Sequence, residues 1–336
     1  ECAYFYFNDQ ATIPLPLQSK SALIRAGAKF LSFIIAIRTG LRIIRSQHIE
    51  LLLGTADNGR ALILMFVLSV LSNRPYVLYF LDLYRWNQLG TVWNLWAHLF
   101  EPILFRYAKN IFVMGEGHQK LYERKYGRRF SYTVIRNCPQ VTQTPVHDKD
   151  RSTPYTILYS GNIYWPQERA IRNLIRAVTN MNIDIRFLLY APQYLARLKS
   201  EYKHNPRVVF SSAPQKEMAA IQSSANILFL PLSFNTPAPE VIEMAVPGKT
   251  AEYLIANRPI LVHAPPYAFL SSYAKENKFA HVVESEETTE LERGVSELIF
   301  NTTYAQELIQ NAKKLFEKEY NMKENALRLK EAIDHL

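Results

Sequence analysis

A lysine and a glutamate stand three residues apart near the start of a predicted helix, in the segment 247–262, PGKTAEYLIANRPILV. Pro247 suits the first turn of a helix, because its missing N–H would have no intrahelical partner there. Lys249 opposes the helix dipole, and an anion bound at that end would reverse the penalty. Glu252 falls on the same helix face. We favour a nucleotide diphosphate site, with Lys249 and backbone N–H groups for phosphate and Glu252 for ribose, over a surface ion pair.

Two further candidate residues follow predicted strands. Gly161 comes directly after an apolar strand and before a helical stretch that begins near Arg169, so its backbone can approach a ligand closely. Most glycines at such positions only make a turn. Asp82 follows the apolar run 75–81, where its carboxylate could orient a sugar or acceptor hydroxyl. Capping a helix or pairing with Arg85 is an equally good interpretation of Asp82.

Several other chemistries are excluded by spacing. The 11 glycines include no G-x-G-x-x-G fingerprint, and Gly248-Lys249-Thr250 is not a P-loop because Glu243 stands where that motif needs glycine. The eight histidines lack metal-ligand spacing, and the D-x-D at 148–150 has no strand before it. We therefore expect no metal and no cofactor. The basic residues are interleaved with apolar ones, which argues against a nucleic-acid partner.

Short apolar runs alternate with longer helical patterns, which is typical of parallel sheets with crossover helices. Strands are predicted at 2–7, 49–54, 75–81, 110–114, 132–135, 155–160, 184–190, 207–211, 226–231, 259–263 and 280–284. Helices are predicted at about 18–47, 57–72, 89–108, 115–126 and 169–180, and from about 303 to the end.

The segment 138–154 has three prolines and no apolar periodicity, so it is predicted as a linker. The fold class is therefore α/β, with two Rossmann-like, doubly wound parallel-sheet domains facing a central cleft. We place the first domain at 1–140, the linker at 141–154, the second domain at 155–320 and a C-terminal helix at 321–336. That helix is expected to cross back to the first domain.

The net charge of +9 is concentrated in the first half. Residues 1–150 hold 18 basic and 10 acidic side chains, whereas residues 151–336 hold 21 and 20. Residues 18–47 combine apolar side chains at helical spacing with Lys and Arg, which suits a helix lying on an anionic membrane. A core-facing helix with a basic outer face explains the same pattern.

The two cysteines, Cys2 and Cys138, cannot form a disulfide framework, and the longest apolar run, 61–71, is too short to span a bilayer. We expect a cytoplasmic protein, peripheral on the inner face of the membrane. The chain begins at Glu1 just before a strand-like run, and we expect that an N-terminal piece is missing.

Taken together, these motifs resemble the retaining GT-B glycosyltransferases of glycosyltransferase family 4. The resemblance covers nearly the whole chain and is carried by 247–262, 155–167, 208–232, 76–86, 110–127 and 134–139. It implies that Glu252 binds the nucleotide ribose and that Gly161, Asn162, Lys249 and Thr250 surround the donor phosphates. It also implies a metal-independent, retaining reaction, in which Asp82 and Lys249 take part.

The chain departs from the family pattern at several positions. Asn162 and Gln167 stand where the family has a basic pair, so Lys249 would carry more of the diphosphate charge, with help from Arg169. Met244 stands at the position of the first glutamate of the family motif, and Glu243, one residue away, is a weak candidate for binding the donor sugar. The family's first strand and glycine-rich loop are not found.

The first hypothesis is a glycosyltransferase that uses a nucleotide diphosphate sugar, with a glycan or lipid-linked acceptor, in cell-surface polysaccharide synthesis. A nucleotide-sugar epimerase of the same fold and a non-catalytic membrane-associated scaffold remain as alternatives. The donor base, sugar and acceptor are not fixed by the sequence.

Overall fold

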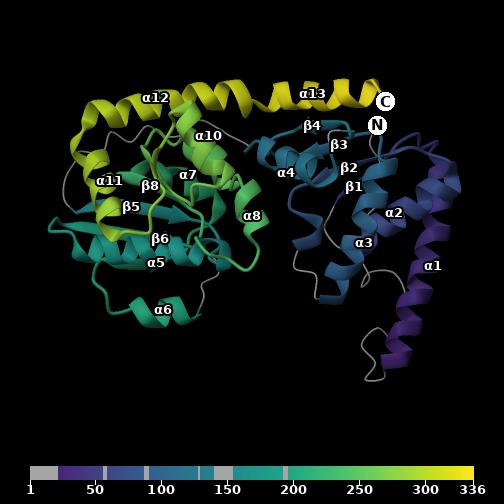
Figure 1. Cartoon of the computed structure of the whole chain (residues 1–336), viewed down its shortest axis with the longest axis horizontal. Helices are drawn as coiled ribbons and strands as arrows, with labels where there is room; N and C mark the ends of the chain where they lie inside the picture. Colours follow the sequence, from purple (N-terminus) through teal and green to yellow (C-terminus); the bar gives the residue numbers. More distant parts are fainter. Residues whose placement is uncertain (1–21, 56–58, 87–90, 128, 140–153, 192–195) are drawn as a thin grey trace. The chain divides into compact units, whose positions relative to one another are not determined.

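The computed structural model describes residues 22–336 except 56–58, 87–90, 128, 140–153 and 192–195 (Figure 1). The chain divides into two compact units. The first holds the described residues up to Val113 together with 122–134 and 334–336, and the second holds 114–121 and 135–333. The predicted strand at 2–7 and nearly all of the predicted linker lie outside the described residues.

The first unit is built on a parallel sheet. Its described strands, in order across the sheet, are β1 (Leu52–Thr55), β2 (Tyr76–Phe80), β3 (Ile111–Val113) and β4 (Tyr132–Val134). The helices are α1 (Ala22–Ser46), α2 (Gly59–Ser72) and α3 (Thr91–Tyr107), and α4 (Glu116–Tyr126) is shared with the second unit. The sequence predicted each of these elements, although β1 begins at Leu52 and not at 49.

The second unit contains a parallel sheet of six strands in the order β10-β9-β8-β5-β6-β7. These are β5 (Tyr155–Ser160), β6 (Ile185–Tyr190), β7 (Val208–Ser211), β8 (Ile227–Pro231), β9 (Ile260–His263) and β10 (His281–Val283). The strand order reverses between β5 and β8, which is the switch point of a doubly wound sheet. The predicted α/β class with two parallel-sheet domains is confirmed.

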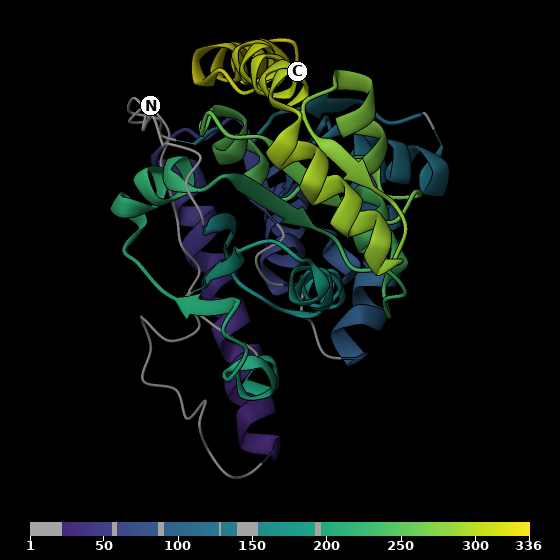
Figure 2. The ribbon, with the colours of Figure 1, turned by 90° about the vertical axis from the view of Figure 1, so that its left-hand side faces the viewer.

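Both faces of this sheet are covered by helices. Successive β5 residues alternate between two apolar clusters, with Ile157 and Tyr159 in one and Leu158 in the other. Helices α5 (Trp165–Asn180) and α11 (Thr288–Phe300) pack on the first cluster, and Figure 2 shows α11 lying across this side of the sheet. The second cluster is covered by α9 (Lys249–Ile255), α10 (Phe269–Asn277) and α12 (Thr302–Glu319). The remaining helices are α6 (Ala196–Tyr202), α7 (Gln215–Ser224), α8 (Pro239–Met244) and α13 (Met322–Asp334).

Helix α9 begins later than the sequence predicted. It begins at Lys249, with Gly248 at the N-cap, so Pro247 precedes the helix and does not stand in its first turn. The carbonyl of Pro247 accepts a hydrogen bond of 2.8 Å from the N–H of Thr250, which closes a tight turn before the helix. Helices α6, α8, α10 and α11 were not predicted from the sequence.

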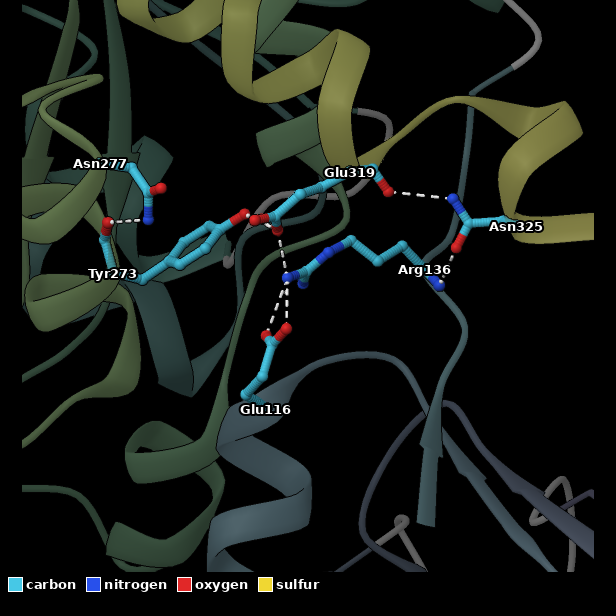
Figure 3. Close-up of polar contacts among 6 residues, drawn as sticks. All are labelled: Glu116, Arg136, Tyr273, Asn277, Glu319 and Asn325. Carbon is cyan, nitrogen blue, oxygen red and sulfur yellow. Dashed lines mark hydrogen bonds and ion pairs between the residues drawn. The ribbon is translucent and has the colours of Figure 1, made fainter. Parts of the chain in front are cut away.

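The buried Arg136 connects four segments within the second unit (Figure 3). Its guanidinium forms an ion pair of 2.8 Å with Glu116 on α4 and a second pair with Glu319 at the end of α12. The Tyr273 hydroxyl on α10 donates to Glu319 at 2.7 Å, and Asn325 on α13 accepts from the backbone N–H of Arg136 at 2.9 Å. Arg136 therefore holds α4, the end of α12 and the start of α13 together beside α10.

Candidate functional site

The candidate site begins where β5 ends, at the switch point of the six-stranded sheet. Ligands of doubly wound sheets bind at this carboxyl edge because the helices leave in opposite directions there. Gly161 has φ of +143°, a conformation that L side chains rarely adopt. A Cβ at this position would lie 3.3 Å from the Tyr159 hydroxyl and 3.7 Å from Cε of Lys249. Glycine is therefore required by conformation, and it brings the backbone close to Lys249.

The loop after Gly161 is held in place by a hydrogen bond from Tyr159. The Tyr159 hydroxyl donates a 2.6 Å hydrogen bond to the carbonyl of Asn162, whose side chain is exposed. Gln167, at the second position where the resemblance expects a cation, has its side-chain oxygen buried without a hydrogen-bond partner among the described residues. The loop thus presents backbone and an amide to solvent, and its binding role stays a prediction.

Lys249 and Glu252 form an ion pair on the first turn of α9. The Lys249 Nζ lies 3.0 Å from Oε1 and 3.1 Å from Oε2 of Glu252, and both side chains are half-buried. The predicted placement of the two groups on one helix face is therefore correct. Because Gly161 lies against the Lys249 side chain, the structure brings Gly161, Lys249 and Glu252 together at one place.

Two residues that the sequence analysis did not single out support this cluster. The Gln222 amide on α7 donates to Glu252 Oε2 at 2.8 Å and to the Ser160 hydroxyl at 3.0 Å. The Tyr253 hydroxyl accepts a 2.9 Å hydrogen bond from the N–H of Ser160 and lies 3.2 Å from its Oγ. Gln222 falls in the segment 208–232, one of those that carry the resemblance, but no local spacing connects it with Glu252.

Thr250 is buried, unlike Lys249 and Glu252 on the same helix. It is completely buried, and its hydroxyl has no hydrogen-bond partner among the described residues. The side chain of Thr250 therefore faces the interior and not the surface on which Lys249 and Glu252 lie. Its assignment to the phosphate site stays a prediction.

Arg169, which we expected to assist Lys249, is paired with another residue. It forms an ion pair of 2.5 Å with Glu286, which also accepts a 3.2 Å hydrogen bond from Asn173. The Asn173 amide lies 3.2 Å from Nε2 of His263, whose Nδ1 lies 3.0 Å from the carbonyl of Val283. Burial lowers the pKa of His263 to about 4, so this imidazole is neutral at physiological pH.

The two remaining candidates lie elsewhere. Asp82 belongs to the first unit, two residues after the end of β2, where partial burial of its carboxyl raises its pKa, although the residue as a whole is exposed. Glu243 is half-buried on α8. Burial and, after it, the charge of Glu243 raise the pKa of Tyr267, which places the two residues near each other. The roles of Asp82 and Glu243 stay predictions.

Known structures share this architecture. A sucrose-phosphate synthase from Thermosynechococcus elongatus has a TM-score of 0.70 at 13% identity, covering 91% of this chain and 78% of that one. Anabaena HepE, solved in complex with UDP-glucose, has a TM-score of 0.69 at 12% identity over 91% of this chain and 82% of that one. The fold is GT-B. A glycosyltransferase from Rickettsia africae has a TM-score of 0.63 at 11% identity, over 94% and 81% of the two chains.

No protein-family model and no curated protein matches the chain. At these low identities, the structural likeness establishes the GT-B fold alone. Assignment to glycosyltransferase family 4 therefore stays an interpretation of the motifs. Among the described residues, no three His, Cys, Asp or Glu side chains gather as a metal site would require.

Proposed function

We propose that this chain is a glycosyltransferase that transfers a sugar from a nucleotide diphosphate sugar to a glycan or lipid-linked acceptor, in the synthesis of a cell-surface polysaccharide. The observation that carries the proposal is the cluster of Gly161, Lys249 and Glu252 at the carboxyl edge of β5 in a GT-B fold. Support comes from Anabaena HepE, a protein of the same fold that was solved with UDP-glucose and with UDP.

The cluster offers complementary groups to the two polar parts of a nucleoside diphosphate. Glu252 can accept hydrogen bonds from the ribose hydroxyls, and Lys249 can neutralise phosphate charge beside the exposed backbone at Gly161. In the structure Lys249 pairs with Glu252. A diphosphate would draw the Lys249 ammonium toward itself, which frees carboxylate lone pairs of Glu252 for the ribose. The ion pair is thus exchanged for two contacts with one ligand.

The proposed reaction is retaining and independent of a metal. The acceptor hydroxyl attacks the anomeric carbon on the face from which the diphosphate departs and passes its proton to the departing phosphate, so no protein nucleophile is required. Lys249 and backbone N–H groups stabilise the negative charge that develops on the leaving phosphate. Asp82 would contact the sugar or the acceptor, and Glu243 the donor sugar. Asn162 and Thr250 complete the proposed phosphate site.

The test is the Glu252→Ala variant with calorimetric titration of nucleoside diphosphates. Removing hydrogen bonds between a carboxylate and the ribose is expected to weaken binding about tenfold or more, because bonds to charged groups contribute about 1.5–3 kcal/mol. Glu290→Ala is a matched control, since Glu290 also forms an i,i+3 ion pair, with Arg293, but on the solvent-exposed face of α11. Equal affinity of Glu252→Ala and the wild type would show that the site is assigned wrongly.

Two other outcomes select the alternative functions. Turnover of the donor without an acceptor would identify an epimerase. Absence of any nucleotide-dependent thermal shift would favour a non-catalytic scaffold, as the replacement of the expected basic pair by Asn162 and Gln167 suggests.

We further propose peripheral contact with an anionic membrane through residues 18–47. On α1, the exposed side chains of Phe30, Arg38, Arg42 and Arg45 fall on one side of the helix, and the arginines line a groove of 570 Å³. Part of the apolar stripe packs in the unit, as at Ile44, so a core-facing helix with a basic outer face explains part of the pattern. None of the described helices is long and apolar enough to pass through a membrane.

A further inference from the structure

Gln222 is a buried amide that contacts the proposed ribose-binding carboxylate. It lies on α7, is 2% exposed and donates through Nε2 to both Glu252 and the Ser160 hydroxyl. Only the NH₂ end of the amide can donate to a carboxylate, so this contact fixes the orientation of the side chain. The Ser160 hydroxyl is itself held beside the Tyr253 hydroxyl at 3.2 Å.

Glu252 therefore has two partners of different kinds. Lys249 reaches both carboxylate oxygens from the more accessible side, whereas Gln222 binds Oε2 from the buried side. In the proposed function the Lys249 ammonium turns toward the diphosphate, and Gln222 then keeps Oε2 in place. A neutral donor fixes the carboxylate without removing its charge, so the other lone pairs stay strong acceptors for hydroxyl groups.

We propose that Gln222 is a positioning residue that orients Glu252 for recognition of the donor ribose. The inference rests on the proposed function, because it assumes that Glu252 binds ribose. Its consequence is a specificity: Gln222 contributes to the discrimination between ribonucleotides and 2′-deoxyribonucleotides and makes no contribution to phosphate binding. A role in packing alone would change the affinities for both kinds of nucleotide together.

The experiment compares Kd values of UDP, ADP and GDP with those of their 2′-deoxy forms, using wild type, Gln222→Met and Gln215→Met. Methionine preserves the length of Gln222 without its donor, and Gln215 is an exposed glutamine on the same helix. The wild type should prefer the ribonucleotide. In Gln222→Met the ratio of the deoxynucleotide Kd to the ribonucleotide Kd should fall about tenfold, which corresponds to about 1.4 kcal/mol. Affinity for the deoxynucleotide, which keeps the 3′-hydroxyl but lacks the 2′-hydroxyl, should fall less than affinity for the ribonucleotide, and Gln215→Met should behave as wild type.

A second variant gives a pH signature and preserves the volume of the side chain. In Gln222→Glu, two carboxylates face each other, with the Lys249 ammonium and the Tyr253 and Ser160 hydroxyls as the other polar groups around them. One shared proton at low pH restores a donor to Glu252, so the ribose preference should return as the pH falls. The wild-type preference should not change with pH over the same range.

The outcomes separate the inference from the function on which it rests. If the wild type prefers ribonucleotides and both Gln222 variants retain that preference at every pH, the positioning role is overturned and the ribose site stands. If the wild type binds ribo and deoxy forms equally, or binds no nucleotide, the role of Glu252 fails and the role of Gln222 fails with it.

Discussion

Replacement of Arg136 by methionine should strongly destabilise the second unit. The guanidinium side chain is 2% exposed and lies between the carboxylates of Glu116 and Glu319, over the rings of Tyr273 and Tyr320 at 5.2 Å from each centroid. Burial alone favours the neutral form, but these tyrosines and carboxylates raise the pKa of Arg136, so it is charged. Methionine fills much of the volume but leaves the Glu319 carboxylate without its cation.

The magnitude follows from the burial of the partners. Breaking a buried ion pair by removing one partner costs about 3–5 kcal/mol. Glu319 is 16% exposed and keeps the Tyr273 hydrogen bond, whereas Glu116 is 41% exposed and can be solvated after the change. We therefore expect the lower end, about 3 kcal/mol. At about 2–4 °C per kcal/mol for a unit of this size, the melting temperature should fall by about 6–12 °C.

Differential scanning calorimetry of the whole chain is the assay, because two units can unfold in separate transitions. Arg293→Met is the control, since its ion pair with Glu290 is exposed and should contribute less than about 1 kcal/mol. Adding Glu319→Gln to Arg136→Met should recover part of the loss, because it removes the unpaired carboxylate. A melting temperature for Arg136→Met equal to that of the control, or no recovery in the double variant, would refute this electrostatic explanation.

Two further predictions concern pH and membrane binding. His263 has a pKa of about 4 in the folded chain against about 6.5 when unfolded. Between these two pH values the unfolded state binds a proton that the native state does not bind, which favours unfolding. This residue should lower the free energy of unfolding by about 2 kcal/mol at pH 5. The urea midpoints measured at pH 7.5 and pH 5 should therefore differ less in His263→Phe than in the wild type. An equal difference in the two proteins would contradict the assignment. Replacing Arg38, Arg42 and Arg45 by glutamine should abolish salt-sensitive co-sedimentation with anionic vesicles, and equal sedimentation of variant and wild type would exclude this helix as the membrane contact.

The sequence alone determined the class of the fold and the local part of the candidate site. The described strands are largely apolar runs of three to six residues because both faces of a parallel sheet are buried, and this pattern is readable without tertiary information. The pairing of Lys249 with Glu252 was predictable because the helix itself brings residues three apart onto one face.

Only the tertiary structure decided which distant groups meet. Gln222 and Glu252 are 30 residues apart, and Arg136 and Glu319 are 183 apart. Arg169, expected beside the phosphates, pairs instead with Glu286, 117 residues away. Periodicity and spacing fix contacts within one helix or strand, but a contact between elements depends on how the sheet orders its strands and how the core packs. For that reason the sequence located the charged pair, and the fold supplied the buried partners that hold it.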